Sequence, residues 1–333
     1  MDIRNTRALK DTASQRLDQA RDAGKIVLIY AGITLTVSLL VTLVNYTLDL
    51  QISKTGGLGS IGTRSVLATI QTVLPIVQMA AMMCLELGYL AAAMRIARGR
   101  YVSPQTLRAG MPRFWAMVRC RLLQALIFMG VGLLSFYLAM QIFLFTPLSN
   151  DAMGILMPLA GDSSVLSSGA LILEEATQMQ LTYAMLPMFV LMLVIFAVAA
   201  TPLVYQYRMA SYVLLDKPAY GALAALRESR GMMRRNRFKL FRLDLSLWWY
   251  YLLTALCACV CYGDQILPLL GVRFPFSDVT AFFLFYGAYL VLQFAVFLCF
   301  LNRVEVTYAL AYDSLRPPEP KTEGVVLGNI FNM

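Results

Sequence analysis

The chain has 333 residues, of which 59% are hydrophobic and only 14% are charged. Soluble domains average about 45–50% apolar and about 25% charged residues, so the composition excludes a water-soluble globule, and it excludes a disordered chain as well. The net charge of +9 could suggest nucleic acid as a partner. Basic residues in a membrane protein more often mark its cytoplasmic side, so we expect no nucleic-acid binding. The composition predicts an integral membrane protein.

Six apolar stretches are long enough to cross a bilayer as helices, a crossing that takes about 20 residues. They are continuous rather than alternating, so we predict an all-α protein with six transmembrane helices and not a β-barrel. The second stretch is interrupted by Pro75, the fifth is short and begins with aromatic residues, and the sixth can continue as a helix to Ala311. In chain order the stretches are Ile26–Leu48, Val66–Met94, Leu122–Pro147, Leu181–Tyr207, Leu245–Gly263 and Val279–Leu301.

Lysine and arginine are distributed unevenly among the segments that connect these stretches. Of the 28 lysine and arginine residues, 25 lie in the segment before the first apolar stretch or in the segments that follow the second, fourth and sixth stretches. The other three are Lys54, Arg64 and Arg273. Cytoplasmic segments carry this excess, so we predict cytoplasmic N- and C-termini and outer loops centred near Gly57, Asp162 and Arg273. The N-terminal segment lacks the apolar core of a cleavable signal peptide, so the first span is expected to remain as an anchor.

Two of the predicted cytoplasmic segments carry apolar residues at helical spacing, which predicts amphipathic helices at the membrane surface. In the second segment, Ser103-Pro104 suits a helix start, because serine is a favoured N-cap and proline is tolerated at the first helical position. The predicted apolar face of the first helix comprises Leu9, Ala13, Leu17 and Ala20. That of the second comprises Leu107, Met111, Phe114, Trp115 and Val118.

The third cytoplasmic segment combines a small apolar face with a row of arginines. The apolar face comprises Ala222, Ala225, Ser229 and Met232. The arginines recur at intervals of three and four residues on another face, and they are Arg227, Arg230, Arg234 and Arg237. A basic residue near an anionic membrane surface contributes about 1 kcal/mol of binding. We therefore predict a helix that lies along the inner leaflet, with the anionic lipids of the bilayer as its partner.

The order of one interfacial helix and two spans occurs three times. We predict a single polytopic domain over residues 1–315, with units of about 1–97, 98–213 and 214–315, followed by a flexible cytoplasmic tail over 316–333. A unit of two spans preserves orientation, so the repeats would be parallel rather than inverted. The alternative is that any six-span protein with amphipathic inner loops shows the same order without a true repeat.

The third segment also carries a recognisable motif over residues 228–246, ESRGMMRRNRFKLFRLDLS. It resembles a bacterial family catalogued as domain of unknown function nine-seven-five, whose members share an ESR-x-MM-x-x-N-x-x-KLF-x-LDLSF core. This chain departs from that pattern at Leu247, where the family usually has phenylalanine, and at Arg235, where it has glycine. The resemblance extends from Leu9 to Leu315. It implies a multi-pass protein of the bacterial plasma membrane and brings no activity with it.

Two acids are candidate functional residues. Glu86 lies within the second apolar stretch, where a charged side chain is costly and often marks a pathway or a polar network. It is expected either to pair with Arg95 or Arg98 or to act in function. Asp244 lies at a membrane boundary near several basic residues, and an ion pair is the main interpretation, with a substrate or proton role as the alternative. Further polar residues of the spans, for which interhelical hydrogen bonds are sufficient, are Asn45, Gln71, Gln78, Gln124, Gln141 and Gln293.

The residues available for catalysis are few. The chain contains no histidine, the most common general base and metal ligand. In the sequence Cys257-Ala258-Cys259-Val260-Cys261, helical spacing places Cys257 and Cys261 on one face and Cys259 on another, which is poor geometry for zinc. Packing is the main interpretation of these thiols, with a redox or metal role as the alternative. We recognise no catalytic set, metal site or cofactor site.

These observations favour a non-enzymatic scaffold or accessory component that assists a partner, such as another membrane protein. The alternative is a transporter or lipid-handling protein that uses a polar path around Glu86, and a lipid-modifying enzyme is a third hypothesis. The arrangement of the polar residues distinguishes the first two. Convergence of Glu86 and the glutamines on one cavity favours transport, whereas dispersal favours a scaffold.

Overall fold

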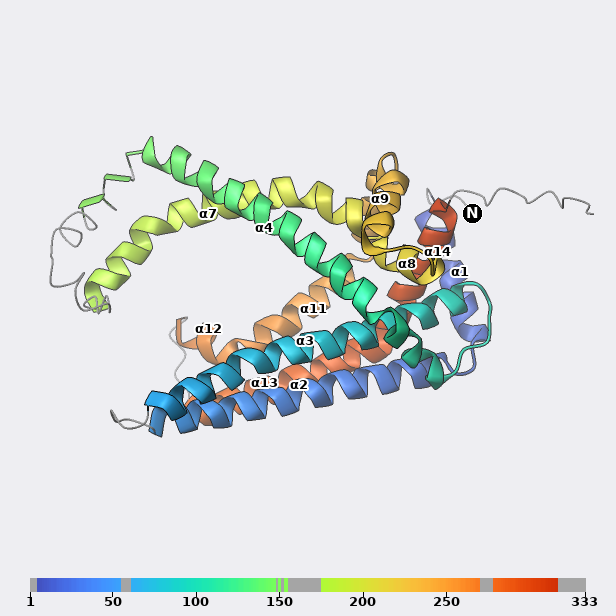
Figure 1. The fold of residues 1–333 in the computed structure, drawn as a ribbon, viewed down its shortest axis with the longest axis horizontal. Helices are drawn as coiled ribbons and strands as arrows, with labels where there is room; N and C mark the ends of the chain where they lie inside the picture. Colours follow the sequence, from blue (N-terminus) through green and yellow to red (C-terminus); the bar gives the residue numbers. More distant parts are fainter. Residues whose placement is uncertain are drawn as a thin grey trace, which may run out of the picture. The chain divides into compact units, whose positions relative to one another are not determined.

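The computed structural model describes residues 5–54, 61–147, 149–150, 153–154, 175–269 and 278–316. Within these ranges all regular elements are helices, which confirms the all-α prediction (Figure 1). Five helical segments are long and apolar enough to cross a membrane, and a bent pair of shorter helices supplies a sixth candidate. The predicted loop centres Gly57, Asp162 and Arg273 and the tail beyond Arg316 lie outside the described residues.

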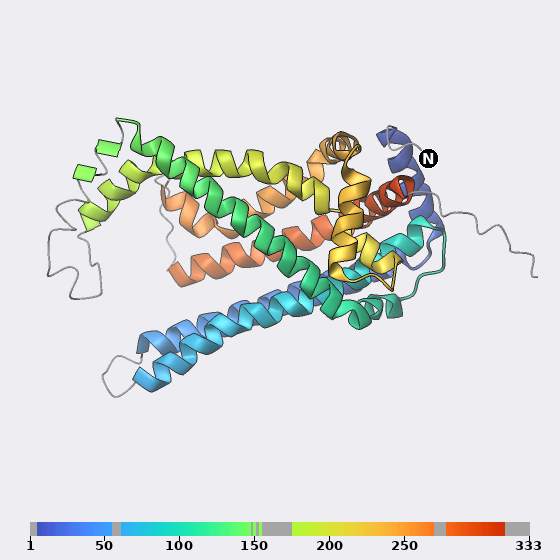
Figure 2. The same ribbon diagram turned by 45° about the horizontal axis from the view of Figure 1, so that its top comes forward.

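The chain packs as two compact units, Met1–Val118 with Met209–Met333, and Arg119–Arg208. In the larger unit, α2 and α3 lie side by side, and α13 packs against α2 and α11 (Figures 1 and 2). Its N-terminal elements are α1 (Thr6–Gln19), α2 (Ala23–Lys54), α3 (Ile61–Ala97) and the 3₁₀ helix η2 (Pro104–Arg113). Its later helices are α8 (Ala210–Asp216), α9 (Ala222–Met233), α10 (Arg237–Ser246), α11 (Trp248–Cys261), α12 (Gly263–Leu269), α13 (Asp278–Val296) and α14 (Asn302–Leu315).

The smaller unit consists of two long helices. These are most of α4 (Phe114–Leu144), which begins in the larger unit, and α7 (Glu175–Tyr207), which contains two prolines. A small core forms where Phe143 of α4 packs with Met188 of α7. At the other end of the pair, the Gln124 side chain donates a hydrogen bond to the Tyr207 carbonyl over 3.4 Å.

The predicted spans correspond to longer helices than the apolar stretches alone. The sixth span continues from α13 through a turn of π-helix, Phe297–Leu301, into α14. The predicted helical extension to Ala311 is therefore confirmed, and the helix continues to Leu315. The fifth differs from the prediction, because the helix breaks at Leu247 and α10 and α11 meet at 64°. The 14 residues of α11 cover about 21 Å, which is shorter than a bilayer core of about 30 Å.

The N-terminal amphipathic helix is confirmed, whereas the second differs in type. In α1, Leu9 and Ala13 of the predicted face are fully buried. Residues 104–113 form a 3₁₀ helix rather than an α-helix, and its period of three places Leu107 and Gly110 inward. Met111, which we predicted on the apolar face, is 65% exposed for the same reason.

The third amphipathic helix is confirmed in its apolar face and corrected in its basic face. The four predicted apolar residues are all buried in α9. The helix ends at Met233, however, and a turn separates it from α10, so the four arginines do not form one continuous row. Arg227 and Arg230 are exposed on α9, Arg234 lies at its C-cap, and Arg237 begins α10.

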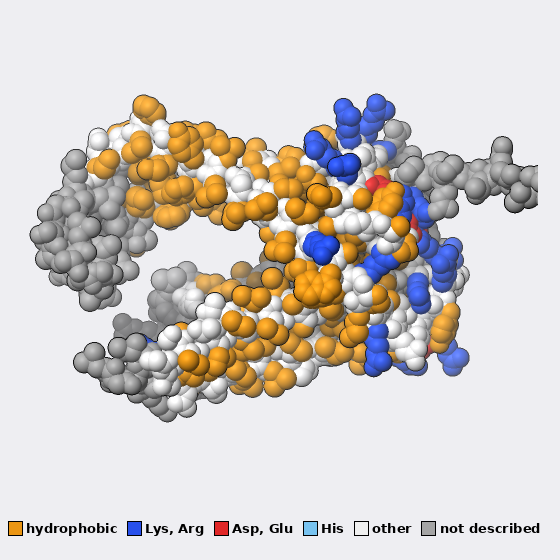
Figure 3. All heavy atoms as spheres, viewed as in Figure 1, with side chains coloured by type: hydrophobic (Ala, Val, Ile, Leu, Met, Phe, Trp, Pro, Cys, Tyr) orange, Lys and Arg blue, Asp and Glu red, His pale blue; other side chains and the backbone are white. Residues whose placement is uncertain are grey.

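Helix α14 is extensively buried in the larger unit. Its apolar residues Val306, Ala309, Ala311 and Tyr312 have no exposed surface, and Thr307 is equally buried. By contrast, large apolar side chains are exposed along α2, α3, α4 and α7, as expected of helices that face lipid (Figure 3). The core therefore lies around α14, at the end of the larger unit where lysine and arginine side chains gather, which we call the basic end (Figure 3).

Candidate functional site

The end of α3 is shaped by a glycine that positions Arg98. Gly99 has a φ of +66° and donates its N–H to the Ile96 carbonyl, while Arg100 N–H reaches the Arg95 carbonyl. This is a Schellman motif, which terminates the helix and satisfies its last carbonyls. A Cβ on Gly99 would lie 2.5 Å from a guanidinium nitrogen of Arg16, so α1 covers this turn closely.

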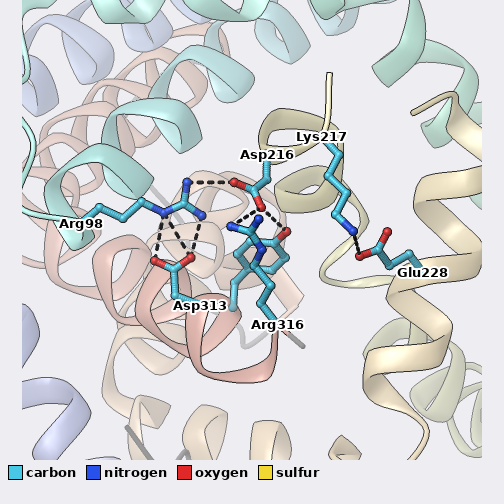
Figure 4. A network of polar contacts seen from close by, with 7 residues as sticks. Arg98, Asp216, Lys217, Glu228, Asp313 and Arg316 are labelled. Atoms are coloured by element: carbon cyan, nitrogen blue, oxygen red, sulfur yellow. Dashed lines mark hydrogen bonds and ion pairs between the residues drawn. The ribbon is translucent and has the colours of Figure 1, made fainter. Parts of the chain in front are cut away.

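Arg98 forms the centre of an ionic cluster that joins three helices (Figure 4). Its guanidinium lies 2.8 Å from Asp216 at the end of α8 and 2.6 Å from Asp313 in α14. The second carboxylate oxygen of Asp216 lies 3.1 Å from Arg316 and accepts a hydrogen bond from the Tyr312 hydroxyl at the same distance. The ionic cluster (Arg98, Asp216, Asp313 and Arg316) thus ties the ends of α3, α8 and α14 together.

The electrostatics of the ionic cluster suit a clamp rather than a catalyst. Two arginines balance two aspartates, and the Asp216 side chain is only 5% exposed. The hydrogen bond to Asp313 is the main cause that raises the pKa of Arg98, and the hydrogen bond to Asp216 adds to it, while burial acts in the opposite direction. Both carboxylates are engaged by guanidinium groups, in charge-assisted hydrogen bonds that are stronger than neutral ones. The cluster stabilises one arrangement of the three helices.

A second ion pair extends the cluster towards α9. Lys217, the residue after Asp216, lies 2.6 Å from Glu228, and both side chains are partly buried (Figure 4). The hydrogen bond that Lys217 donates to the Glu228 carboxylate raises the pKa of Lys217 above its ordinary value. Because Glu228 opens the family-like motif, the pair connects that motif to α8. It fixes α9 relative to the ionic cluster.

The polar side chains of α14 reach a different neighbour on almost every turn. Asn302 donates to the Ala23 carbonyl at the start of α2 and accepts from Tyr89 of α3. Glu305 accepts from Tyr212 of α8, at 3.0 Å. Tyr308 donates to Asp244 of α10 and meets the hydroxyl of Tyr251 of α11. Together with the ionic cluster, these contacts make α14 the hub of the larger unit.

Sequence reasoning did not identify this hub. Asn302, Glu305, Tyr308 and Tyr312 follow one another at intervals of three and four residues, which places them along one region of a helix. That spacing was a usable signal, since polar residues at helical period in an apolar helix indicate interhelical bonds. The identities of the partners, up to 279 residues away, were not encoded in any local pattern.

Glu86 is half-buried on α3, and its expected pairing with Arg95 or Arg98 stays a prediction. Both arginines also contact other residues. Arg98 binds Asp216 and Asp313, and Arg95 lies 3.5 Å from the Thr106 hydroxyl. Tyr30 of α2 lies close enough to Glu86 to interact with it electrostatically. The residue stands 25 positions from the start of α3, beyond the roughly 20 residues that a bilayer core requires.

Three of the other polar residues of the spans form separate local contacts. Gln71 donates to Asp49 at 2.7 Å, and Gln78 approaches Ser38 at 3.4 Å; both bonds join α2 and α3 at different heights. Gln124 bonds within the smaller unit. These contacts do not converge on one cavity, and each satisfies a polar group where it stands.

Asp244 and the cysteines have structural surroundings. Asp244 accepts a hydrogen bond from Tyr308 of α14. The ion pair expected from the sequence stays a prediction. Cys257 is buried, Cys261 is half-buried and Cys259 is exposed, in agreement with the predicted faces of the helix. No group of three potential metal ligands occurs among the residues that the structure describes.

The long apolar helices, the exposed apolar faces and the ionic cluster at one end define a multi-pass α-helical membrane protein. The family model described as Protein of unknown function (DUF975) matches residues 3–316, and the chain belongs to that family. This confirms the resemblance seen in the motif over residues 228–246. No curated protein and no solved structure matches the chain.

Proposed function

We propose that the protein is a non-enzymatic scaffold or accessory component of the bacterial plasma membrane, which holds a membrane-protein partner. The observation that supports this most directly is the clamped basic end, where α14 binds α2, α3, α8, α10 and α11 through individual polar contacts. Such a core favours one fixed arrangement of helices. A rigid platform suits a protein that presents a surface to a partner.

The surface that we assign to the partner is the exposed side of α9. Leu223 is 64% exposed there, and Arg227 and Arg230 lie one and two turns further along. The opposite side of α9 is packed, and the Lys217–Glu228 pair fixes the helix. An exposed apolar residue beside two arginines is a favourable composition for a protein interface.

The neighbouring α10 is assigned to the bilayer. Its exposed apolar residues Phe238, Phe241 and Leu245 alternate with basic residues, and Trp248 and Trp249 follow at the start of α11. Aromatic and basic side chains together favour the membrane–water interface and anionic lipids. Together with the positive-inside rule, this composition supports a cytoplasmic location for the basic end and both termini.

A transporter or lipid-handling protein is the second candidate. It is favoured by one observation, the half-buried Glu86 beside Tyr30 of α2. Gln71, Gln78 and Gln124 argue for the scaffold, because they bond locally rather than along a common path.

The two candidates are separated by photo-crosslinking in cells combined with complementation of a deletion strain. A photoreactive amino acid at Leu223, Arg227 or Arg230 is expected to give a protein adduct of one discrete mass, and charge reversal of both arginines should abolish the adduct and the complementation together. Placement at Val66, an exposed apolar position at the far end of α3, is the control and should yield no such adduct. Loss of complementation in Glu86→Gln at normal protein level, with no effect of the α9 variants, would instead establish the transport candidate.

A further inference from the structure

A lateral groove opens between α2, α3 and η2 in the larger unit. Its volume is about 510 Å³, within the range of small-molecule sites. Residues Ile29, Ile33 and Val37 form its wall on α2 and extend over about 12 Å of that helix. The remaining lining residues are Ala81, Met82, Cys84 and Leu85 of α3, and Pro104, Gln105, Leu107, Arg108 and Met111 of η2 and its start.

The groove lies at the boundary of the bilayer core. The ends of α2 and α3 that meet across residues 55–60 are the ends farthest from the basic end (Figure 1). Counting the roughly 20 residues of a bilayer crossing from those ends reaches Thr34 on α2 and Ala81 on α3. Val37 and Ala81 therefore lie at the edge of the hydrocarbon region, where an acyl chain enters it. The other wall residues of α2 and α3 lie between this edge and η2, which is at the level of the headgroups.

The 3₁₀ helix η2, which forms the roof of the groove, packs with its backbone directly on α3. A Cβ on Gly88 would lie 1.8 Å from the Leu107 carbonyl oxygen, and a Cβ on Gly110 would lie 2.4 Å from the Cys84 carbonyl oxygen. Only glycine at both positions allows η2 to pack on α3 this closely. As a result, Arg108 is held beside the groove by a rigid element rather than by a mobile loop.

The charge of the lining is one-sided. Arg108 is exposed, and none of the lining residues is acidic. The whole stretch from Arg95 to Arg121 contains seven arginines and no acid. A zwitterionic headgroup carries an ammonium group, and no carboxylate in the lining of the groove could bind it. An anionic headgroup carries the phosphate, which arginine binds, without an ammonium group.

We infer that this groove binds one anionic phospholipid, with an acyl chain against α2 and α3 and the phosphate at Arg108. The apolar walls, the basic residue at headgroup level and the fixed roof are the features of a lipid site between membrane helices. The inference does not depend on a scaffold function, because it concerns a different face from that of α9.

The test is native mass spectrometry of the full-length protein in detergent, titrated with phosphatidylglycerol or phosphatidylethanolamine. The first phosphatidylglycerol is expected to bind more tightly than phosphatidylethanolamine. Arg108→Gln should weaken phosphatidylglycerol binding by about fivefold, while Arg108→Lys keeps most of the preference. Ala81→Phe should fill the groove and remove binding of the first lipid. The matched controls Arg7→Gln on α1 and Ala68→Phe, farther along α3, should leave the titration unchanged.

Three results would overturn the lipid site. The first is equal binding of the two lipids to the unmodified protein, and the second is an Arg108→Lys variant without the preference. The third is an Ala68→Phe variant that loses the first lipid as completely as Ala81→Phe, because this would indicate unspecific annular lipid rather than a site.

Discussion

At Asp216 three side chains meet one carboxylate: two arginines from either side and the hydroxyl of Tyr312. A buried charge of this kind is stabilising only while its partners are present, since removal of one member leaves the others desolvated and uncompensated. Asp313, by contrast, is 29% exposed and meets only Arg98 in the cluster. Removal of the Asp216 carboxylate therefore breaks more contacts of the ionic cluster than removal of the Asp313 carboxylate.

Asp216→Asn is expected to lower the free energy of unfolding by about 1.5–3 kcal/mol, the usual worth of hydrogen bonds to a charged group. The loss follows because Arg98 and Arg316 would then face each other across a neutral amide. Thermal unfolding in detergent micelles measures it. Asp313→Asn is the matched variant and should cost less; an equal or larger loss for Asp313→Asn would contradict the central role of Asp216.

Gly99→Ala tests the turn that positions Arg98. A left-handed conformation costs a non-glycine residue about 1–2 kcal/mol, so the variant should be less stable by that amount. Gly99→Asn should lose less, since asparagine tolerates this region. Gly24→Ala in α2, where an added Cβ meets no atom within 4 Å, is the control and should be neutral or stabilising. Thermal unfolding of the three variants gives the comparison.

At the scale of elements, the contact between η2 and α3 sets the strictest steric demand. Gly88→Ala or Gly110→Ala would force backbone atoms apart, because a Cβ at either position overlaps a main-chain carbonyl. Overpacking costs about 1–3 kcal/mol, and more where backbone must move. We expect a clear fall in the yield of monodisperse protein on size-exclusion chromatography. Gly130→Ala in α4, which has open space around its Cα, should express like the unmodified protein.

The elements show which features a sequence encodes locally. Hydrophobic length located the spans, because about 20 apolar residues in a row are costly anywhere except in a bilayer. Burial of Leu9 and Ala13 in α1 was predictable from spacing. The 3₁₀ form of residues 104–113 was not, because it accompanies a close contact with α3 that Gly110 of η2 and Gly88 of α3 allow. The break at Leu247 was not predictable either, because no proline or glycine lies near it in the sequence.

At the scale of the whole molecule, the polar contacts are long-range while the apolar pattern is local. Arg98 and Asp313 are 215 residues apart, and Asn302 and Ala23 are 279 apart. Such pairs form only after the helices have associated, so no window of the sequence reveals them. The candidate residues named from the sequence, Glu86 and Asp244, were found because an acid in an apolar context is conspicuous. The hub to which Asp244 belongs required the structure.

The orientation of the molecule in the membrane is open to a direct test. The distribution of 25 of 28 basic residues on one side predicts that both termini and α9 face the cytoplasm. In a cysteine-free background, a cysteine at Asp162 should react with a membrane-impermeant maleimide in intact cells. A cysteine at Arg227, which is exposed on α9, should react only after permeabilisation. Arg227 tests the third connection and a cysteine at Arg7 tests the N-terminus, so an even number of crossings between them requires both to behave alike. Labelling of the cysteine at position 7 but not of that at position 227 in intact cells would mean an odd number of crossings, and one of α2, α3, α4 and α7 would then have to be reassigned.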